Sequence, residues 1–510
     1  MDASILETKP LEQINRLVQA ISIGVPLQRV DLDLDVSSKV ALPALQETSL
    51  LLVSQLDAIS PIELAGYFNL NSHEIEVLVS ELIRTDLVKF NDEGDLVETL
   101  QLSTIKRQNS GELGIAIEEV VNHNESTYID LVTGFIQPRS ESNIQRGLPT
   151  IERKINEKDF SEYITKQFRR FQACLPHSKY ELKSDSTRLY RVNHALAAGS
   201  LLQIVSLNIK ATSDPLMGIS LESDVIDYNA DNMLLLEQSG LPQVVHNWLA
   251  TREHDPYTVS GQDYCDIARD NVLGKYIDHT NTLDLKQLLI DRVRKKTGYG
   301  EARETNMLIG PIYIPSNRQI IEQWLIRRSV KERMSQGIWL GATNELFGAS
   351  LGFSNFIADI NKQLQEGDRN SALNLCYRKS PKNIGRELQG RFNTRTNGQL
   401  HTFDYGTSDS HMEILVFPGE RGCALIQFHA KVSNEFGFKG LTIPVGYFTT
   451  NSERVAYLWK VVQNRIQSNE LRRFKSDKSE LTEPLNTQLS VSHQLMDDYL
   501  KGLDEAKARG

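Results

Sequence analysis

Apolar residues recur at helical spacing in three consecutive segments that begin at Pro43. The first is LPALQETSLLLVSQLDA, and the second, ISPIELAGYFNL, has Ser60 as a candidate cap with Pro61 at the first helical position. The third, NLNSHEIEVLVSELIRTDLV, has Ser72 as a candidate cap and ends at Asp86. The pattern predicts three helices, the third with one apolar face made of Ile75, Leu78, Val79, Leu82 and Ile83.

Two short strands are predicted directly after the third helix. The segment LVKFNDEGDLVETLQL alternates around a turn at Asn91-Asp92-Glu93-Gly94, which is typical of a hairpin. Helix, helix-turn-helix and hairpin over about residues 46–103 resemble the winged-helix fold. We therefore expect a winged-helix module with an N-terminal helix within residues 1–110.

The middle of the chain mixes helical and strand patterns. A strand is predicted at 127–138, and the polar stretch RSESNIQRG at 139–147 indicates a linker, so residues 111–147 are expected to form a strand and a linker. Residues 148–330 are expected to form a mixed α/β middle domain. Its patterns are the helical DFSEYITKQFRRFQACL and DLKQLLIDRVRKK and the strand-like LLQIVSLNI, GISLESDVIDY and NMLIGPIYI.

The pattern becomes more regular from Gln336 onward. GIWLGA, ALNLCYR, HMEILVFP and GCALIQFHAKV predict strands, while GFSNFIADINKQLQEGD and SPKNIGRELQGRF predict helices. Alternating strands and helices indicate an α/β layer with a right-handed crossover over residues 331–470, followed by a charged helical tail at 471–510. The expected fold class is therefore α/β and α+β, multi-domain.

Composition limits the interpretation of these elements. The net charge of −10 gives no overall field that favours nucleic acid, so any DNA contact requires local basic patches. The four cysteines are far apart, which predicts reduced thiols and no zinc site. The start MDASILETKPLEQ does not resemble a secretory signal, and we expect a cytoplasmic protein without membrane contact.

The third predicted helix carries charges that bear on DNA binding. In a winged helix this helix usually enters the major groove. Its outward face has Glu74, Glu76 and Glu81, with Arg84 and His73 as possible donors, and carboxylates repel phosphates. DNA binding and a protein-protein module both stay open, and the charge favours the protein partner.

His429 and Lys431 are the candidate catalytic residues. They lie two apart in the predicted strand QFHAKV, so both side chains fall on one face. This stretch, with the strand-helix-strand before it, resembles the phospholipase D-like fold over about 335–465, whose mark is His-x-Lys. The resemblance implies a histidine that attacks phosphorus or protonates the leaving group, and a lysine that binds phosphate, without a metal.

The motif of that family is only partly present. The usual Asp position holds Phe436 beside Glu435, and Val445–Thr449 stands where Gly-Ser is expected. Active members need a second motif, from the same chain or from a homodimer. His177 and Lys179 have the same spacing but no strand leads into them, so we interpret that pair as a coincidence.

A basic segment beside this motif is the candidate nucleic-acid-binding site: Arg378, Lys379, Lys382, Arg386, Arg391 and Arg395. Two further basic groups, at 292–296 and 327–333, could also follow a phosphate backbone, and a solvated helix face is the alternative for each. The polar residues His401, Asp404, Asp409, His411 and Glu413 are spaced too irregularly for a metal site. No cofactor is expected.

The leading hypothesis is a DNA-associated recognition or scaffold subunit of a bacterial nucleic-acid-processing or antiviral defence assembly, with protein partners and a possible homodimer. The combination of the two resembled folds implies this context. One alternative is a metal-independent phosphodiesterase or nuclease that uses His429 and Lys431. Another is a transcription regulator with a ligand-sensing C-terminal domain.

Overall fold

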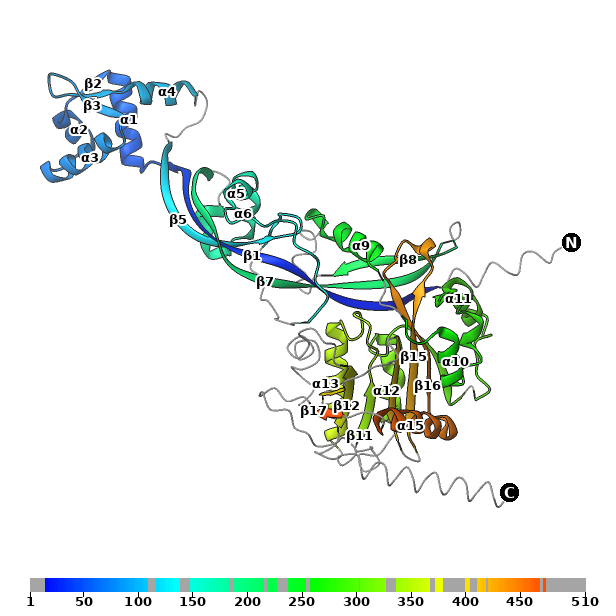
Figure 1. Cartoon of the computed structure of the whole chain (residues 1–510). Coiled ribbons are helices and arrows are strands. Elements are labelled where there is room, and N and C mark those ends of the chain that lie inside the picture. Colours follow the sequence, from blue (N-terminus) through cyan, green and yellow to red (C-terminus); the bar gives the residue numbers. More distant parts are fainter. Residues whose placement is uncertain are drawn as a thin grey trace, which may run out of the picture.

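The structure is a computed structural model of mixed α and β composition, and Figure 1 shows a small head and a larger body joined by a long curved ribbon. No helix in the part of the chain described has the length and apolarity needed to cross a membrane. The structure describes residues 14–108, 116–137, 147–183, 187–214, 218–226, 237–253, 257–301, 303–326, 336–366, 372–378, 400–403, 411–418, 421–467 and 471–473.

The ribbon is an antiparallel five-stranded sheet with the order β6-β5-β1-β7-β8. β1 and β7 are each 27 residues long, which at about 3.3 Å per residue gives a length on the order of 90 Å. The ribbon is curved, and the pairing of β1 with β7 contains several register shifts along its length. The strands are β1 (Asn15–Ala41), β5 (Ala116–Asp130), β6 (Ile136–Gln137), β7 (Arg188–Asp214) and β8 (Gly218–Ile226).

The outer half of β1 shows why the sequence forms this strand. In the stretch VDLDLDV, Val30, Leu32 and Leu34 are buried while the aspartates between them point to the other face. The buried face packs on Phe160, Ile164 and Phe171 of the helical layer that covers the ribbon. That layer contains α5 (Ser161–Lys166), α6 (Phe168–Cys174), the 3-10 turn η2 (His177–Lys179) and α7 (Tyr180–Lys183).

The head has the order of elements expected for a winged helix. Three helices precede a hairpin, and a short strand completes a three-stranded sheet with the order β2-β4-β3. The cap at Ser60 is confirmed as a capping box with Glu63, whereas the third helix is capped by Asn71 and not by Ser72. The elements are α1 (Ala44–Leu56), β2 (Ala58–Ile59), α2 (Pro61–Phe68), α3 (Ser72–Arg84), β3 (Val88–Phe90), β4 (Leu96–Glu98) and α4 (Leu100–Gln108).

The head is inserted into the tip of the ribbon. β1 ends at Ala41 and β5 starts at Ala116, and these two residues are partners in the β1–β5 ladder. The segment before the head is therefore a ribbon strand, and the head lies at the end of the ribbon far from the body (Figure 1).

The body is built on a nine-stranded mixed sheet with the order β10-β16-β15-β14-β11-β12-β13-β17, in which β9 pairs with β15. β11, β12 and β13 are parallel, and the strands from β11 through β14, β15 and β16 to β10 are antiparallel neighbours. The strands are β9 (Thr282–Leu283), β10 (Thr305–Ile309), β11 (Gln336–Leu340), β12 (Ala372–Arg378), β13 (Leu400–Phe403), β14 (Met412–Phe417), β15 (Cys423–Val432), β16 (Thr442–Thr449) and β17 (Leu471–Arg473).

Helices cover both faces of this sheet. One core contains α12 and α13 with Trp339 and Phe417. The other core contains α9, α10, α11 and α15 together with the inner half of the ribbon, so ribbon and body share one apolar interior. The helices are α9 (Leu241–Thr251), α10 (Gly261–Ala268), α11 (Leu285–Val293), α12 (Pro315–Ile326), α13 (Leu351–Gln365) and α15 (Ser452–Gln467), with 3-10 turns η4 (Leu273–Lys275) and η6 (Asn434–Phe436).

Strand pairing corrects the expected middle domain at 148–330. β7 and β8 pair within the ribbon, while β10 pairs with β16 of the body sheet, so this segment has no separate sheet among its described residues. The physical reason is that strand patterns carry no information about distant partners. The predicted helix in SPKNIGRELQGRF, the linker at 139–146 and the tail beyond 473 lie outside the described residues.

Candidate functional site

The outward face of α3 is less purely acidic than the sequence indicates. At helical spacing, His73, Val77, Ser80 and Arg84 form one exposed row. Two of the three flanking carboxylates are engaged locally. Glu74 accepts a hydrogen bond from the backbone N–H of Asn71 at 2.9 Å, and the Glu81 carboxylate accepts one from Gln46 of α1 at 2.5 Å.

The hairpin that forms the wing adds further negative charge. The side chain of Asn91 accepts hydrogen bonds from the backbone N–H groups of Glu93 and Asp95 at 2.9 Å, which fixes the turn. From Ala44 to Gln108, eleven acidic residues oppose four basic ones. The acidic residues are Glu47, Asp57, Glu63, Glu74, Glu76, Glu81, Asp86, Asp92, Glu93, Asp95 and Glu98.

Large apolar side chains are also exposed on the head. Ile62 and Tyr67 of α2 are 84% and 66% exposed, and Val77 of α3 and Phe90 of β3 are about half exposed. Exposed apolar groups within an acidic surface are typical of a protein-binding surface, because phosphates are repelled and apolar burial favours association.

The structure places His429 and Lys431 near the end of the inner strand β15. This is the end of the sheet at which β11 ends and β14 begins. The His429 side chain is buried, with 3% of the residue exposed. Its Nε2 lies 3.1 Å from Glu413 Oε1, and Glu413 Oε2 accepts a hydrogen bond from Trp339 Nε1 at 2.8 Å. The ammonium of Lys431 lies 5.0 Å from the centre of the Tyr257 ring.

Neighbouring groups close this cluster from the outside. The rings of Tyr257 and His411 stack at 3.7 Å, and the Tyr257 hydroxyl donates to the His429 carbonyl at 2.9 Å. The Phe347 ring contacts His429 edge-on. A closed imidazole that is fixed by a carboxylate suits a structural role, and the catalytic role of His429 and Lys431 stays a prediction that this burial does not favour.

The remaining parts of the His-x-Lys interpretation lie apart from this cluster. Glu435, beside the usual Asp position, pairs with Lys286 at 2.8 Å. His177 and Lys179 lie in a 3-10 turn on the ribbon, where Lys179 pairs with Glu125 of β5. His177 and Lys179 therefore do not lie on a strand, although their spacing equals that of His429 and Lys431.

The predicted nucleic-acid-binding residues are only partly within the described residues. Arg378 is the last residue of β12, but the structure does not describe its side chain. Lys379, Lys382, Arg386, Arg391 and Arg395 lie outside the described residues. In the basic group at 292–296, the Arg292 side chain donates a hydrogen bond to the Met307 carbonyl at 2.8 Å. Burial lowers the pKa of the Arg292 guanidinium. The group at 327–333 lies outside the description, and within the described residues His, Cys, Asp and Glu nowhere gather into a possible metal site.

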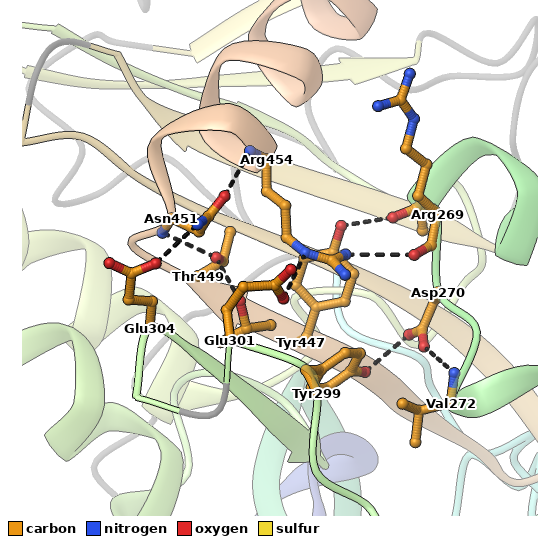
Figure 2. Close-up of polar contacts among 12 residues, drawn as sticks. Arg269, Asp270, Val272, Tyr299, Glu301, Glu304, Tyr447, Thr449, Asn451 and Arg454 are labelled. Atoms are coloured by element: carbon orange, nitrogen blue, oxygen red, sulfur yellow. Dashed lines mark hydrogen bonds and ion pairs between the residues drawn. The ribbon is translucent and has the colours of Figure 1, made fainter. Parts of the chain in front are cut away.

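Sequence reasoning missed a buried polar network around Asp270 and Arg454 (Figure 2). The Tyr299 hydroxyl donates to Asp270 Oδ2 at 3.0 Å, while the backbone N–H groups of Val272 and Leu273 donate to Oδ1. Burial raises the pKa of the Asp270 carboxyl, and these hydrogen bonds offset part of the rise. No local motif marks this network, because its members are distant in sequence.

Arg454 joins this network to the start of α15. Its Nη1 donates to the Arg269 carbonyl at 3.3 Å, and its Nε lies 3.4 Å from a Glu301 carboxylate oxygen. The guanidinium also lies 5.1 Å from the centre of the Tyr447 ring (Figure 2). These contacts connect α10, β16 and α15, which indicates that Arg454 stabilises their packing.

Comparison with known proteins assigns neither a family nor a fold to this chain. No family model matches the sequence, and no curated protein matches it significantly. A solved structure of TrmBL2, an archaeal chromatin protein that shows a novel mode of DNA binding, overlaps with a TM-score of 0.20 and 9% identity. The overlap covers 41% of this chain and 66% of that chain, which is less than two thirds of its length. It is too loose to transfer a fold or a ligand.

Proposed function

We propose that this chain is a DNA-associated recognition or scaffold subunit of a larger nucleic-acid-processing assembly. The observation that carries the proposal is the placement of the head at the tip of a ribbon with 27-residue strands, whose inner half shares a core with the body. A recognition module at the far end of a ribbon on the order of 90 Å long, whose outer half extends beyond the body, is suited to joining two components.

The head is proposed to bind a protein component. Both elements with which a winged helix usually contacts DNA are rich in carboxylates, and the Asp92-Glu93-Gly94-Asp95 turn of the hairpin has no cation to offset them. The exposed Ile62 and Tyr67 supply the apolar area that a protein interface buries.

The body is proposed to contact the nucleic acid through its basic segment. Six cations lie within the 18 residues that start at Arg378, the last residue of β12, and Glu387 opposes them. Such density favours a phosphate backbone, because each contact releases condensed counterions. These residues are Arg378, Lys379, Lys382, Arg386, Arg391 and Arg395.

The test is binding of the purified chain to random duplex and single-stranded DNA across a salt series. The wild type is expected to bind at low salt. The triple variant Arg386→Ala, Arg391→Ala, Arg395→Ala should bind more weakly. The slope of its salt dependence should fall by about 0.9 for each phosphate that the variant no longer neutralises.

The matched control removes two cations from the head, Arg84→Ala and Lys89→Ala. This variant should bind DNA as the wild type does. The proposal is wrong if the head variant loses binding while the triple variant keeps it, or if the wild type does not bind at low salt.

A further inference from the structure

A cleft of about 540 Å³ opens at the end of the body sheet where β15 begins. His429 lies near the opposite end of the same strand. β15 begins beside this cleft, at Gly422 and Cys423, and reaches His429 only near its other end. Its volume falls in the range of small-molecule sites, roughly 300 to 1,000 Å³. Its lining consists of Arg303, Glu304, Asn306, Ile320, Gln323, Trp324, Arg421, Gly422, Phe448 and Thr450.

The apolar part of the lining is aromatic and held in place. Trp324 of α12 is 8% exposed, and its ring centre lies 5.3 Å from that of Phe417. Phe448 of β16 is almost fully buried in the same core. A wall of fixed aromatic rings favours a flat apolar ligand group, because offset stacking adds to burial.

The charged part of the lining favours an anion. Arg303 and Arg421 are exposed on the rim, and Glu304 is the one carboxylate in the lining. Glu304 is turned to the side, where its Oε2 accepts a hydrogen bond from the Asn451 amide at 2.7 Å (Figure 2). Guanidinium groups bind carboxylates and phosphates through paired hydrogen bonds.

We propose that this cleft binds a small organic anion that carries a flat aromatic ring. The carboxylate or phosphate contacts Arg303 and Arg421, and the ring packs against Trp324 and Phe448. The cleft shares no residue with the head or with the basic segment after β12, so the inference is independent of the proposed DNA and protein contacts.

Calorimetric titration of the full chain with 1-naphthyl phosphate tests this inference. Inorganic phosphate and neutral 1-naphthol serve as probes of the two halves of the ligand. Naphthyl phosphate should bind at least ten-fold more tightly than either half. Arg421→Gln and Arg303→Gln should each weaken it by about ten-fold, as expected for one charge-assisted contact.

Arg153→Gln is the matched control, since Arg153 is an exposed arginine outside the cleft. This variant should leave the affinity unchanged. Glu304→Gln removes the one carboxylate of the lining and should keep or raise the affinity for naphthyl phosphate.

Tryptophan fluorescence locates the bound ring. Naphthyl phosphate should change the emission of the wild type and of Trp248→Phe, and this change should disappear in Trp324→Phe. Circular dichroism verifies that each variant is folded. Equal affinity for naphthol, unchanged affinity in both cleft arginine variants, or no binding at millimolar concentration would each overturn the inference.

Discussion

His429 is surrounded by groups that hold it rather than present it to a substrate. Its ring contacts Glu413 and Phe347, and its backbone carbonyl accepts from Tyr257. The apolar pattern of GCALIQFHAKV correctly predicted a strand that contains both His429 and Lys431. It could not predict burial, because Glu413 is contributed by the neighbouring strand β14.

The first prediction concerns the stability that His429 provides. His429→Ala leaves the buried Glu413 carboxylate without one partner, so the free energy of unfolding should fall by about 3 kcal/mol. Lys431→Ala, at a half-buried site, should cost under about 1 kcal/mol. Urea unfolding measures both. Chelator-resistant nuclease activity that disappears in a folded His429→Ala variant would contradict this account.

A second residue-scale prediction concerns pH. Burial raises the pKa of Asp270 above 3.8, so the folded chain holds a proton that the unfolded chain has lost in the window above that value. The folding stability that this bound proton contributes is fully present below pH 3.8, and it is lost as the pH rises through the raised pKa of Asp270. The free energy of unfolding of the wild type, relative to Asp270→Asn, should therefore decrease with rising pH across this window.

Asn at this position can accept the same backbone N–H groups, so it keeps the geometry without the charge. Urea unfolding of the two proteins between pH 3.5 and 7 measures the difference. A difference that is constant or increases with pH would show that Asp270 is not destabilised by its burial.

At the scale of elements, β16 depends on the absence of a side chain at Gly446. A Cβ there would lie 2.1 Å from the Ile426 carbonyl oxygen and 2.6 Å from the Tyr264 hydroxyl. Gly446→Ala should therefore force β15 and β16 apart and lower the free energy of unfolding by about 3 kcal/mol.

Gly199→Ala in β7 is the control for this prediction, because a Cβ at Gly199 meets no atom within 4 Å. Its effect should stay within about 0.5 kcal/mol. Chemical unfolding compares the two variants. Equal stability of the two would mean that β15 and β16 approach less closely than the structure shows.

Elements with a strong local period were predictable, and their partners were not. The α3 pattern and the Asn91–Gly94 turn are complete within one short segment, so the elements of the head, which run from Ala44 to Gln108, were predicted at about residues 46–103. The expected domain bounds of 1–110 wrongly include the ribbon strand β1. The alternation of VDLDLDV also marks β1. Pairing of β10 with β16 joins residues more than 130 apart, which no local pattern encodes.

At the scale of the whole molecule, the described residues join the head to the rest of the chain at the ribbon tip. Since Ala41 and Ala116 are ladder partners, a two-residue Asn-Gly turn can replace residues 42–115 and close the hairpin. We expect this headless chain to fold with the same thermal midpoint for the body, measured by calorimetry. A body that no longer unfolds cooperatively would show that the head is part of its core.

DNA binding by the headless chain distinguishes a DNA contact in the body from one in the head. The headless chain and the wild type should bind duplex DNA with the same affinity and the same salt dependence, because the proposed contact lies in the body. Loss of DNA binding in a folded headless chain would place the contact on the head and show that the proposed separation of the two binding functions is wrong.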